Sequence, residues 1–191
     1  MTKRVVIFAS GGGSNFENLV RNSNDIGMEV IGLIVDKPNA FAINRAEQLK
    51  IPYSIFDRKE YKSRQDFESD ILEKLSEMDV DYLILSGFMR ILSTEFVDKY
   101  DRKIINIHPS LLPAFRGATA IYDAYMYGVK VSGVTIHYVD SGVDTGEIIA
   151  QKSLYIEDGE SLDSFEEKIH QLEYDLYPAT LKKLFKGDVR E

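Results

Sequence analysis

Short β-branched apolar runs alternate with segments of helical periodicity along the first two-thirds of the chain, and this alternation constrains the fold more than any other feature. It is typical of a parallel sheet whose strands are joined by crossover helices. The predicted strands are residues 5–9, 30–35, 53–56, 82–86 and 104–107, and the predicted crossover helices are residues 16–21, 42–49 and 67–78. We therefore expect an α/β fold built on a mostly parallel, twisted sheet.

The pattern changes after Pro109. A further helix and then two longer strands are predicted at residues 119–127, 131–139 and 148–156. Because a Gly- and Asp-rich loop separates the two strands, we expect them to form an antiparallel extension of the sheet. Residues 162–185 carry an apolar stripe at helical spacing, and Pro178 predicts an interruption of that helix.

The 191 residues are expected to form a single domain, because the chain has no internal repeat, low-complexity stretch or Pro- or Ser-rich linker. A formal net charge of −8 makes the chain a poor generic partner for nucleic acid or an anionic membrane. The absence of cysteine excludes disulfides, thiolate metal sites and cysteine nucleophiles. No apolar run approaches the roughly 18 residues of a membrane span, so we expect a cytoplasmic protein.

A glycine-rich segment, residues 10–15 (Ser-Gly-Gly-Gly-Ser-Asn), lies between a predicted strand and a predicted helix. Phe16 replaces the third glycine of a dinucleotide-binding fingerprint, and no Lys-Ser/Thr pair follows, so the segment matches neither that fingerprint nor a P-loop. Backbone N–H groups at the start of a helix favour an anion. The segment therefore either binds a single phosphate or forms a tight turn capped by Ser or Asn.

Asn106 and His108 end another predicted strand, and the alternation of side chains along a strand places them on the same face. The carboxyl edge of an open α/β sheet is where ligands bind, and an amide beside an imidazole can stabilise an oxyanion. A lone histidine at a strand end is more often structural. We interpret His137, within an apolar strand, as a core or edge histidine and His170, on the last helix, as a surface residue.

The loop at residues 140–146 contains two aspartates and two glycines and is read by default as a turn between strands. Its functional interpretation requires an aspartate to fold back on His108, where it would orient the imidazole and favour its charged form. The sequence alone does not bring the two together. The chain has no nucleophile-elbow motif, no HExxH motif and no distinctive carboxylate pair. The remaining chemistry is an acyl-type transfer without a covalent nucleophile.

Six segments in the same order resemble the family of 10-formyltetrahydrofolate-dependent formyltransferases. They are residues 10–15, 87–92 (Gly-Phe-Met-Arg-Ile-Leu), 106–113 (Asn-Ile-His-Pro-Ser-Leu-Leu-Pro), 133–137 (Gly-Val-Thr-Ile-His), 140–146 and 173–178. The resemblance covers nearly the whole chain and is strongest to the members that act on phosphoribosylglycinamide. It implies a Rossmann-like formyltransferase fold with a phosphate-binding half, about residues 1–100, and a folate-binding and catalytic half, about residues 101–191.

The resemblance also implies which residues bind the two substrates. Those expected to bind the phosphoribosylglycinamide are Gly13, Ser14, Asn15 and Glu173. Those expected to bind the folate are Arg64, Met89, Arg90, Ile91, Leu92, Asn106, Asp140 and Asp144. The formyl donor would be 10-formyltetrahydrofolate, held partly by backbone groups that read its pterin. No metal is implied.

In the implied reaction, the glycinamide amine attacks the formyl carbon directly. Asn106 and protonated His108 would stabilise the oxyanion, while Asp144 would tune His108 and help to organise a water that carries the proton. The products would be formylglycinamide ribonucleotide and tetrahydrofolate, a step of de novo purine (IMP) biosynthesis. The implied partners are these small molecules, and we expect a monomer or a weak homodimer.

Two departures from the family pattern concern the amine acceptor. Arg116-Gly117-Ala118 is reminiscent of the family's methionyl-tRNA and sugar-nucleotide enzymes, and Tyr174 replaces a frequent histidine after Glu173. The alternatives are thus a formyltransferase for another amine, the deformylase that uses water, and a binder without activity. The chain is too short for a C-terminal nucleic-acid domain and starts directly at the first strand without a regulatory domain, which weakens the tRNA enzyme and the deformylase.

Overall fold

The computed structural model describes residues 2–187 of the chain. Its strands are β1 (Lys3–Ala9), β2 (Met28–Val35), β3 (Tyr53–Ile55), β4 (Tyr82–Leu85), β5 (Ile104–His108), β6 (Val131–Tyr138) and β7 (Ile148–Tyr155). Its helices are α1 (Ser14–Arg21), α2 (Ser23–Ile26), α3 (Ala42–Leu49), η1 (Arg58–Glu60), α4 (Arg64–Ser76), α5 (Thr94–Lys99), α6 (Ala120–Tyr127) and α7 (Leu162–Lys186).

The seven strands form one sheet in the order β3-β2-β1-β4-β5-β6-β7. The five strands from β3 to β5 are parallel to their neighbours, whereas β6 and β7 pair antiparallel. The mostly parallel sheet with an antiparallel C-terminal extension is therefore confirmed. Because the strand order reverses between β1 and β4, the helices that follow these two strands, α1 and α5, pack on opposite faces of the sheet, and open α/β sheets bind ligands in the crevice at such a point.

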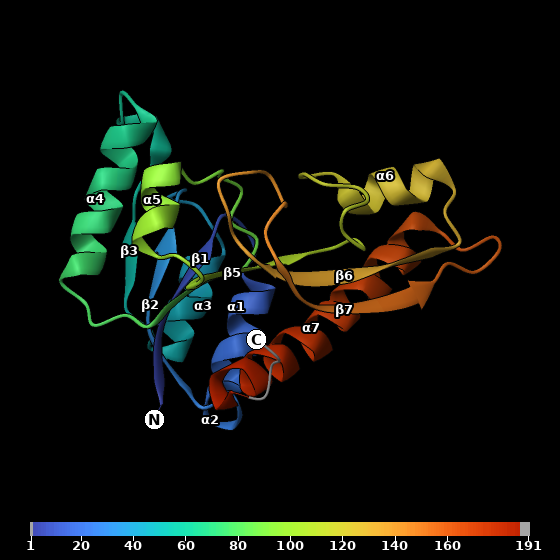
Figure 1. The fold of residues 1–191 in the computed structure, drawn as a ribbon, viewed down its shortest axis with the longest axis horizontal. Helices are drawn as coiled ribbons and strands as arrows, with labels where there is room; N and C mark the ends of the chain where they lie inside the picture. Colours follow the sequence, from blue (N-terminus) through green and yellow to red (C-terminus); the bar gives the residue numbers. More distant parts are fainter. Residues whose placement is uncertain (1, 188–191) are drawn as a thin grey trace.

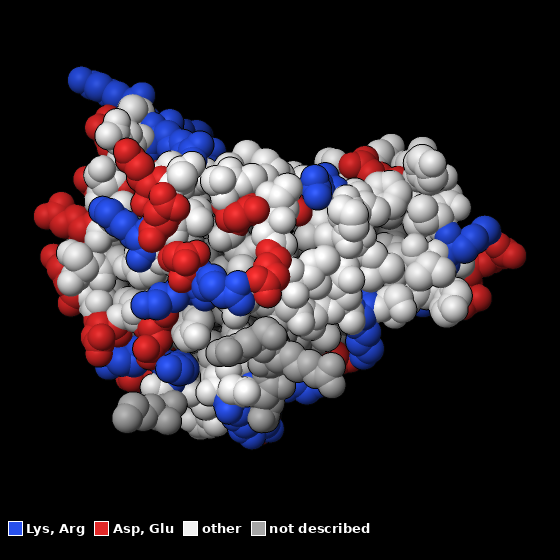
Figure 2. Space-filling view, in the orientation of Figure 1, with Lys and Arg blue, Asp and Glu red and all other residues white. Residues whose placement is uncertain are grey.

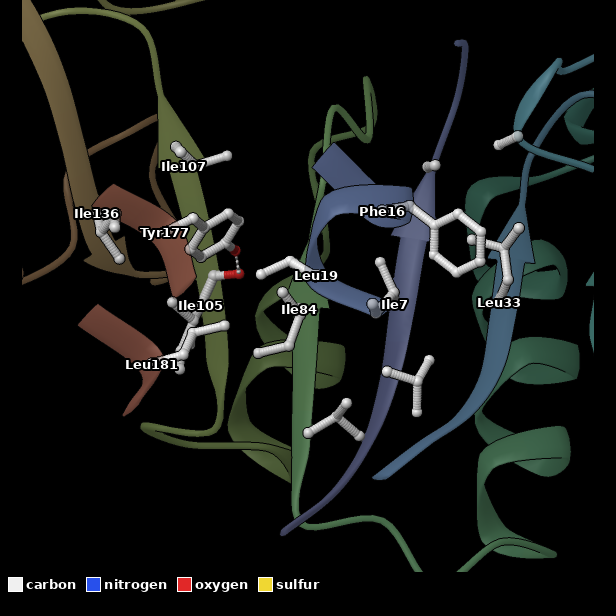
Figure 3. Packing of buried hydrophobic residues seen from close by; sticks show 14 of the residues in the cluster. Ile7, Phe16, Leu19, Leu33, Ile84, Ile105, Ile107, Ile136, Tyr177 and Leu181 are labelled. Carbon is white, nitrogen blue, oxygen red and sulfur yellow. Dashed lines mark hydrogen bonds between the residues drawn. The ribbon is translucent and has the colours of Figure 1, made fainter. Parts of the chain in front are cut away.

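The helices cover both faces of the sheet and create two hydrophobic cores (Figure 1). The larger core packs α1, α3 and α7 against one face, and the smaller core packs α4 and α5 against the other. In the larger core, Tyr177 of α7 lies over β4 and β5, and its fully buried hydroxyl contacts the carbonyl oxygens of Leu85 (2.9 Å) and Ile105 (3.1 Å; Figure 3). This contact anchors the last helix to β4 and to β5, the strand that carries Asn106 and His108.

Three short helices, α2, η1 and α5, were not expected from periodicity because each is only a turn or so long. The starts of η1 and α5 depend on local side-chain hydrogen bonds. The Ser93 hydroxyl, for example, accepts from the Phe96 N–H at 3.1 Å and so begins α5. In the same way, Ser63 accepts from the Asp66 N–H, and α4 begins at residue 64 rather than at the expected residue 67.

The expectation that Pro178 interrupts the last helix is wrong, since α7 runs unbroken from residue 162 to residue 186. A proline inside a helix leaves the carbonyl four residues earlier without its N–H donor. That carbonyl belongs to Tyr174, and it accepts instead from the side-chain amide of Asn18 on α1, at 2.9 Å. A neighbouring helix thus satisfies the group that the proline releases.

Charged side chains are unevenly spread over the face drawn in Figure 2. Basic and acidic residues mix over the α4 and α5 side, while the surface over α6, β6 and β7 is mostly uncharged (Figures 1 and 2). This face therefore carries no continuous basic surface of the kind that binds nucleic acid. Within residues 2–187, no helix combines the length and the apolar character that crossing a membrane requires.

Candidate active site

A cavity of about 780 Å³ lies at the carboxyl edge of the sheet. The ends of β1, β4 and β5 form its floor, and the loop at residues 140–144, the start of α6 and one side of α7 form its walls. The cavity is large enough for a drug-sized ligand. The glycine-rich segment, the strand-end histidine and the aspartate loop, which are distant in the sequence, all line it.

Asn106, His108 and Asp144 meet within this cavity. Asp144 Oδ2 lies 3.4 Å from His108 Nδ1, so the loop folds back on the histidine as its functional interpretation required. On the other side of the ring, His108 Nε2 donates to the carbonyl oxygen of Phe115 at 2.8 Å. Because both ring nitrogens face oxygen acceptors, the imidazole is held in one orientation.

The sequence reasoning missed His137 as a member of this cluster. The antiparallel register pairs it with Asn106, and its Nε2 lies 3.1 Å from Asn106 Nδ2 and 3.6 Å from Asp144 Oδ1. Its Nδ1 donates to the Tyr138 carbonyl at 2.8 Å, so Nε2 accepts from the Asn106 amide when the ring is neutral and can donate to Asp144 when the ring is charged. The interpretation as a satisfied core histidine is correct as far as burial goes, but the ring also lines the cavity. Only the strand register, which the sequence does not reveal, could have identified it.

The environment of Asp144 favours its charged form. Burial by itself would raise the pKa of this carboxyl, but the imidazole of His137, the Gly117 N–H at 2.9 Å and the charge of His108 together lower the pKa to about 2. The loop reaches this position only because Gly146 has no side chain, since a Cβ there would overlap the Tyr138 carbonyl oxygen. Asp144 is therefore an anion fixed beside two imidazoles.

The glycine-rich segment presents backbone N–H groups to the cavity. Gly13 precedes α1 in a left-handed conformation (φ 72°), and a Cβ there would lie 2.6 Å from the Ala42 Cβ. The carbonyls of Gly11 and Gly12 are tied to α3, by the Ala42 N–H (3.0 Å) and by Arg45 Nε (2.8 Å). The first N–H groups of α1 have no partner within the helix, so they are available to an anion.

Glu173 lies beside this segment, as the resemblance implied. Its Oε2 accepts from Asn15 Nδ2 and from His170 Nδ1, each at 3.0 Å. His170 was expected to be a surface residue, and 43% of its side chain is exposed, but it also lines the cavity next to Glu173. The hydrogen bond to Glu173 raises the pKa of His170, against the opposing effect of burial. The helical spacing of residues 170 and 173 was the available signal, since it places both on one face of α7.

Most residues expected to bind the folate also line the cavity. These are Met89, Arg90, Ile91, Leu92, Asn106, Asp140 and Asp144. Arg64 is not among the lining residues: it starts α4, is exposed, and pairs with Glu68 at 3.0 Å. The two residues that depart from the family pattern, Arg116 and Tyr174, do not line the cavity either, although Gly117 and Ala118 do.

Comparison with known proteins finds similarity along almost the whole chain. The family model described as formyl transferase matches residues 3–181. The phosphoribosylglycinamide formyltransferase of Bacillus subtilis is 45% identical over 184 residues, which cover 95% of this chain and 94% of that protein. The human trifunctional purine biosynthetic protein adenosine-3 is 37% identical over 189 residues, 98% of this chain but only 19% of that longer protein.

Solved structures with the same fold include two phosphoribosylglycinamide formyltransferases. The crystal structure from Bacillus halodurans superposes with a TM-score of 0.93 at 45% identity and covers 96% of this chain and 95% of that chain. The structure from Brucella melitensis superposes with a TM-score of 0.92 at 37% identity and covers both chains completely. The Rossmann-like formyltransferase fold is thereby confirmed.

Proposed function

The chain belongs to the formyl transferase family, and from this membership we propose that it transfers the formyl group of 10-formyltetrahydrofolate to the amine of phosphoribosylglycinamide. The enzyme class rests on relatives that are named as phosphoribosylglycinamide formyltransferases and as a purine biosynthetic protein. The choice of amine acceptor is supported by one observation above all. The cavity that holds Asn106, His108 and Asp144 extends without interruption to residues 13–15, where a phosphate would bind.

The proposed reaction begins when the glycinamide amine attacks the formyl carbon. A C–N bond forms, and the carbonyl electron pair moves onto the oxygen of a tetrahedral intermediate. Asn106 Nδ2 has two hydrogens, of which one is directed to His137, so the second is available to this oxygen. His108 Nδ1 makes only a long contact of 3.4 Å to Asp144, which it can exchange for the developing charge.

The intermediate then collapses. The bond between the formyl carbon and N10 of the folate breaks, tetrahydrofolate leaves, and its nitrogen takes up the proton that the amine loses. Asp144 is an anion beside the reacting centre, so it supports a water that passes this proton from the amine to the leaving nitrogen. Phosphate binding at residues 13–15 and the contacts of Glu173 would hold the amine in line for attack.

The first experiment incubates the protein with 10-formyltetrahydrofolate, with and without phosphoribosylglycinamide, and follows folate absorbance and product mass. We expect formylglycinamide ribonucleotide to appear, and folate to be consumed, only when the ribonucleotide is present. Equal deformylation in its absence would identify the hydrolase instead. No turnover in either mixture would contradict the proposed acceptor and leave another amine or a binding protein.

A further inference from the structure

The segment at residues 88–92 has no regular secondary structure and lines the cavity. It lies where the formyl donor is proposed to bind, a part of the cavity called the donor side below. Phe88 and Leu92 are buried in the smaller core, while Met89 and Ile91 are exposed at its surface. No helix or strand ladder fixes the backbone between them. If this backbone reads the pterin, its shape must be set by tertiary contacts.

Three such contacts hold this segment and the residue after it. The Met89 N–H donates to the buried hydroxyl of Ser10 at 2.8 Å. Arg90 Nε donates to Asp36 Oδ2 at 2.5 Å. The Ser93 N–H donates to Glu68 Oε1 at 2.9 Å. Two of the three partners are thus carboxylates of buried residues on neighbouring elements.

Glu68 also pairs with Arg64, whereas the side chain of Asp36 has its one hydrogen-bond partner among residues 2–187 in this segment. Asp36 follows β2, and its side chain is 0% exposed. Its Oδ1 has no hydrogen-bond partner among residues 2–187, and Oδ2 has Arg90. A buried carboxylate with a single cationic partner holds that partner strongly, because separating them leaves an unpaired buried charge.

We propose that Asp36 is a positioning residue for the formyl donor, acting through Arg90 on the backbone of residues 89–92. The inference rests on the proposed function and extends it from residues that line the cavity to one that lies behind it. Asp36 belongs to the end of β2, next to the parallel strand whose end carries Ser10. The donor side of the cavity is therefore attached to the ends of two neighbouring strands.

The opposite part of the cavity, at residues 13–15 and Glu173, is where the ribonucleotide is proposed to bind; this ribonucleotide side offers a matched control. Arg45 Nε donates to the Gly12 carbonyl from outside the cavity and pairs with Glu17, so Arg45 supports the glycine-rich segment in the way that Asp36 supports residues 89–92. The substitution Asp36→Asn removes the charge of a supporting side chain at nearly constant size, and Arg45→Met removes the charge together with the donor to Gly12. The inference predicts that each substitution raises the KM of one substrate and leaves the KM of the other unchanged.

The experiment measures kcat and both KM values for the wild type and the two variants. We expect Asp36→Asn to raise the KM for 10-formyltetrahydrofolate by about tenfold and to leave the KM for the ribonucleotide within about twofold. Arg45→Met should show the reverse. A general structural role would raise both KM values of Asp36→Asn together or lower kcat alone, and either result would overturn the inference.

Direct binding distinguishes the inference from the proposed function. Calorimetry with tetrahydrofolate and with ribose 5-phosphate gives the affinity for each side of the cavity without turnover. If the wild type binds tetrahydrofolate and Asp36→Asn binds it with the same affinity, the inference alone is overturned. If the wild type does not bind tetrahydrofolate, the inference and the proposed function are both overturned. If Asp36→Asn does not fold, Arg90→Lys keeps the charge but loses the planar donor, and an unchanged affinity for tetrahydrofolate in that variant also overturns the inference.

Discussion

The three histidines of the chain differ in what surrounds each ring rather than in residue type. His108 lies between a carboxylate and a backbone carbonyl, His137 between a backbone carbonyl and an amide, and His170 beside two glutamates. The first two are nearly fully buried, and the third is partly exposed. In the proposed function their partners suit them to different tasks: stabilising charge, orienting Asn106, and pairing with Glu173 beside the proposed phosphate-binding segment.

Replacing His108 by Ala tests its catalytic role. We expect kcat to fall by about 100-fold or more, because a donor to the oxyanion and its positive charge are both lost. Affinities for tetrahydrofolate and ribose 5-phosphate, measured by calorimetry, should change little. A variant that retains most of its turnover would show that the assignment is wrong, and a wild type that binds both ligands without turnover would be a binding protein.

The low pKa of Asp144 predicts how stability depends on pH. The folded-state pKa of about 2 lies below the ordinary value of 3.8, so the folded state favours the carboxylate by about 2 kcal/mol. This contribution to the free energy of unfolding is fully present above about pH 4 and is lost as the pH falls toward 2. Urea unfolding of the wild type and Asp144→Asn should therefore give a stability difference that is constant from pH 7 to 5 and shrinks by about 1.5 kcal/mol at pH 2.5. A difference that stays constant down to pH 2.5 would contradict the assigned environment.

At the scale of the elements, helix α7 depends on α1 for one of its own backbone groups. Pro178 removes the N–H that would bond to the Tyr174 carbonyl, and the Asn18 amide replaces it. The same face of α7 also presents Glu173 to Asn15. The arrangement lets a long helix stay continuous where its sequence contains a breaker, and it keeps α1 and α7 in register at the ribonucleotide side.

A double-mutant cycle tests this replacement. Asn18→Ala should lower the free energy of unfolding by about 1 kcal/mol, because the Tyr174 carbonyl loses its donor. In the Pro178→Ala background the loss should be smaller, since the substituted alanine would supply the normal helical N–H to that carbonyl. Urea unfolding of the four proteins gives the coupling energy. Additive effects would mean that the Asn18 contact does not compensate for the proline.

At the scale of the whole molecule, the site forms because strand pairing in the sheet changes from parallel to antiparallel after β5. The parallel strands bring their carboxyl ends to one edge. The antiparallel strand β6 then places His137 beside Asn106, and the loop between β6 and β7 folds Asp144 back onto His108. The long helix α7 packs against β6 and β7 and, through Tyr177, against β4 and β5 (Figure 1), and its Glu173 lies beside Asn15 at one end of the cavity. Residues from both halves of the chain thus meet in one cavity.

Tyr177 joins α7 to this sheet, and its removal tests the connection. Tyr177→Phe deletes a fully buried hydroxyl and leaves two buried strand carbonyls with one donor fewer, so we expect the free energy of unfolding to fall by about 1–3 kcal/mol. Both KM values should stay within about twofold, because Tyr177 does not line the cavity. Urea unfolding measures the first effect. The exposed Tyr155→Phe is the control, and equal stability losses in the two variants would contradict this role.

Much of the fold follows from local properties of the sequence. The periodicity of the apolar residues determined the parallel strands, the main crossover helices and the antiparallel extension, because each periodicity reports which face of one element is buried. The glycine-rich segment and the residues Asn106 and His108 were also identifiable, since strand alternation and the position before a helix are local properties. The family resemblance added Glu173 and Asp144 through motifs that are contiguous in the chain.

What the tertiary structure alone decided depends on pairings between distant segments. The register of β5 against β6 places His137 on Asn106, the packing of α1 on α7 supplies the donor that keeps the helix continuous at Pro178, and the end of β2 places Asp36 under Arg90. Periodicity is insensitive to such pairings, because a one-residue shift of register changes every cross-strand partner without changing the sequence of either strand. The sequence determined the main strands and helices and the candidate residues Asn106 and His108, whereas the long-range packing decided which residues meet in the cavity.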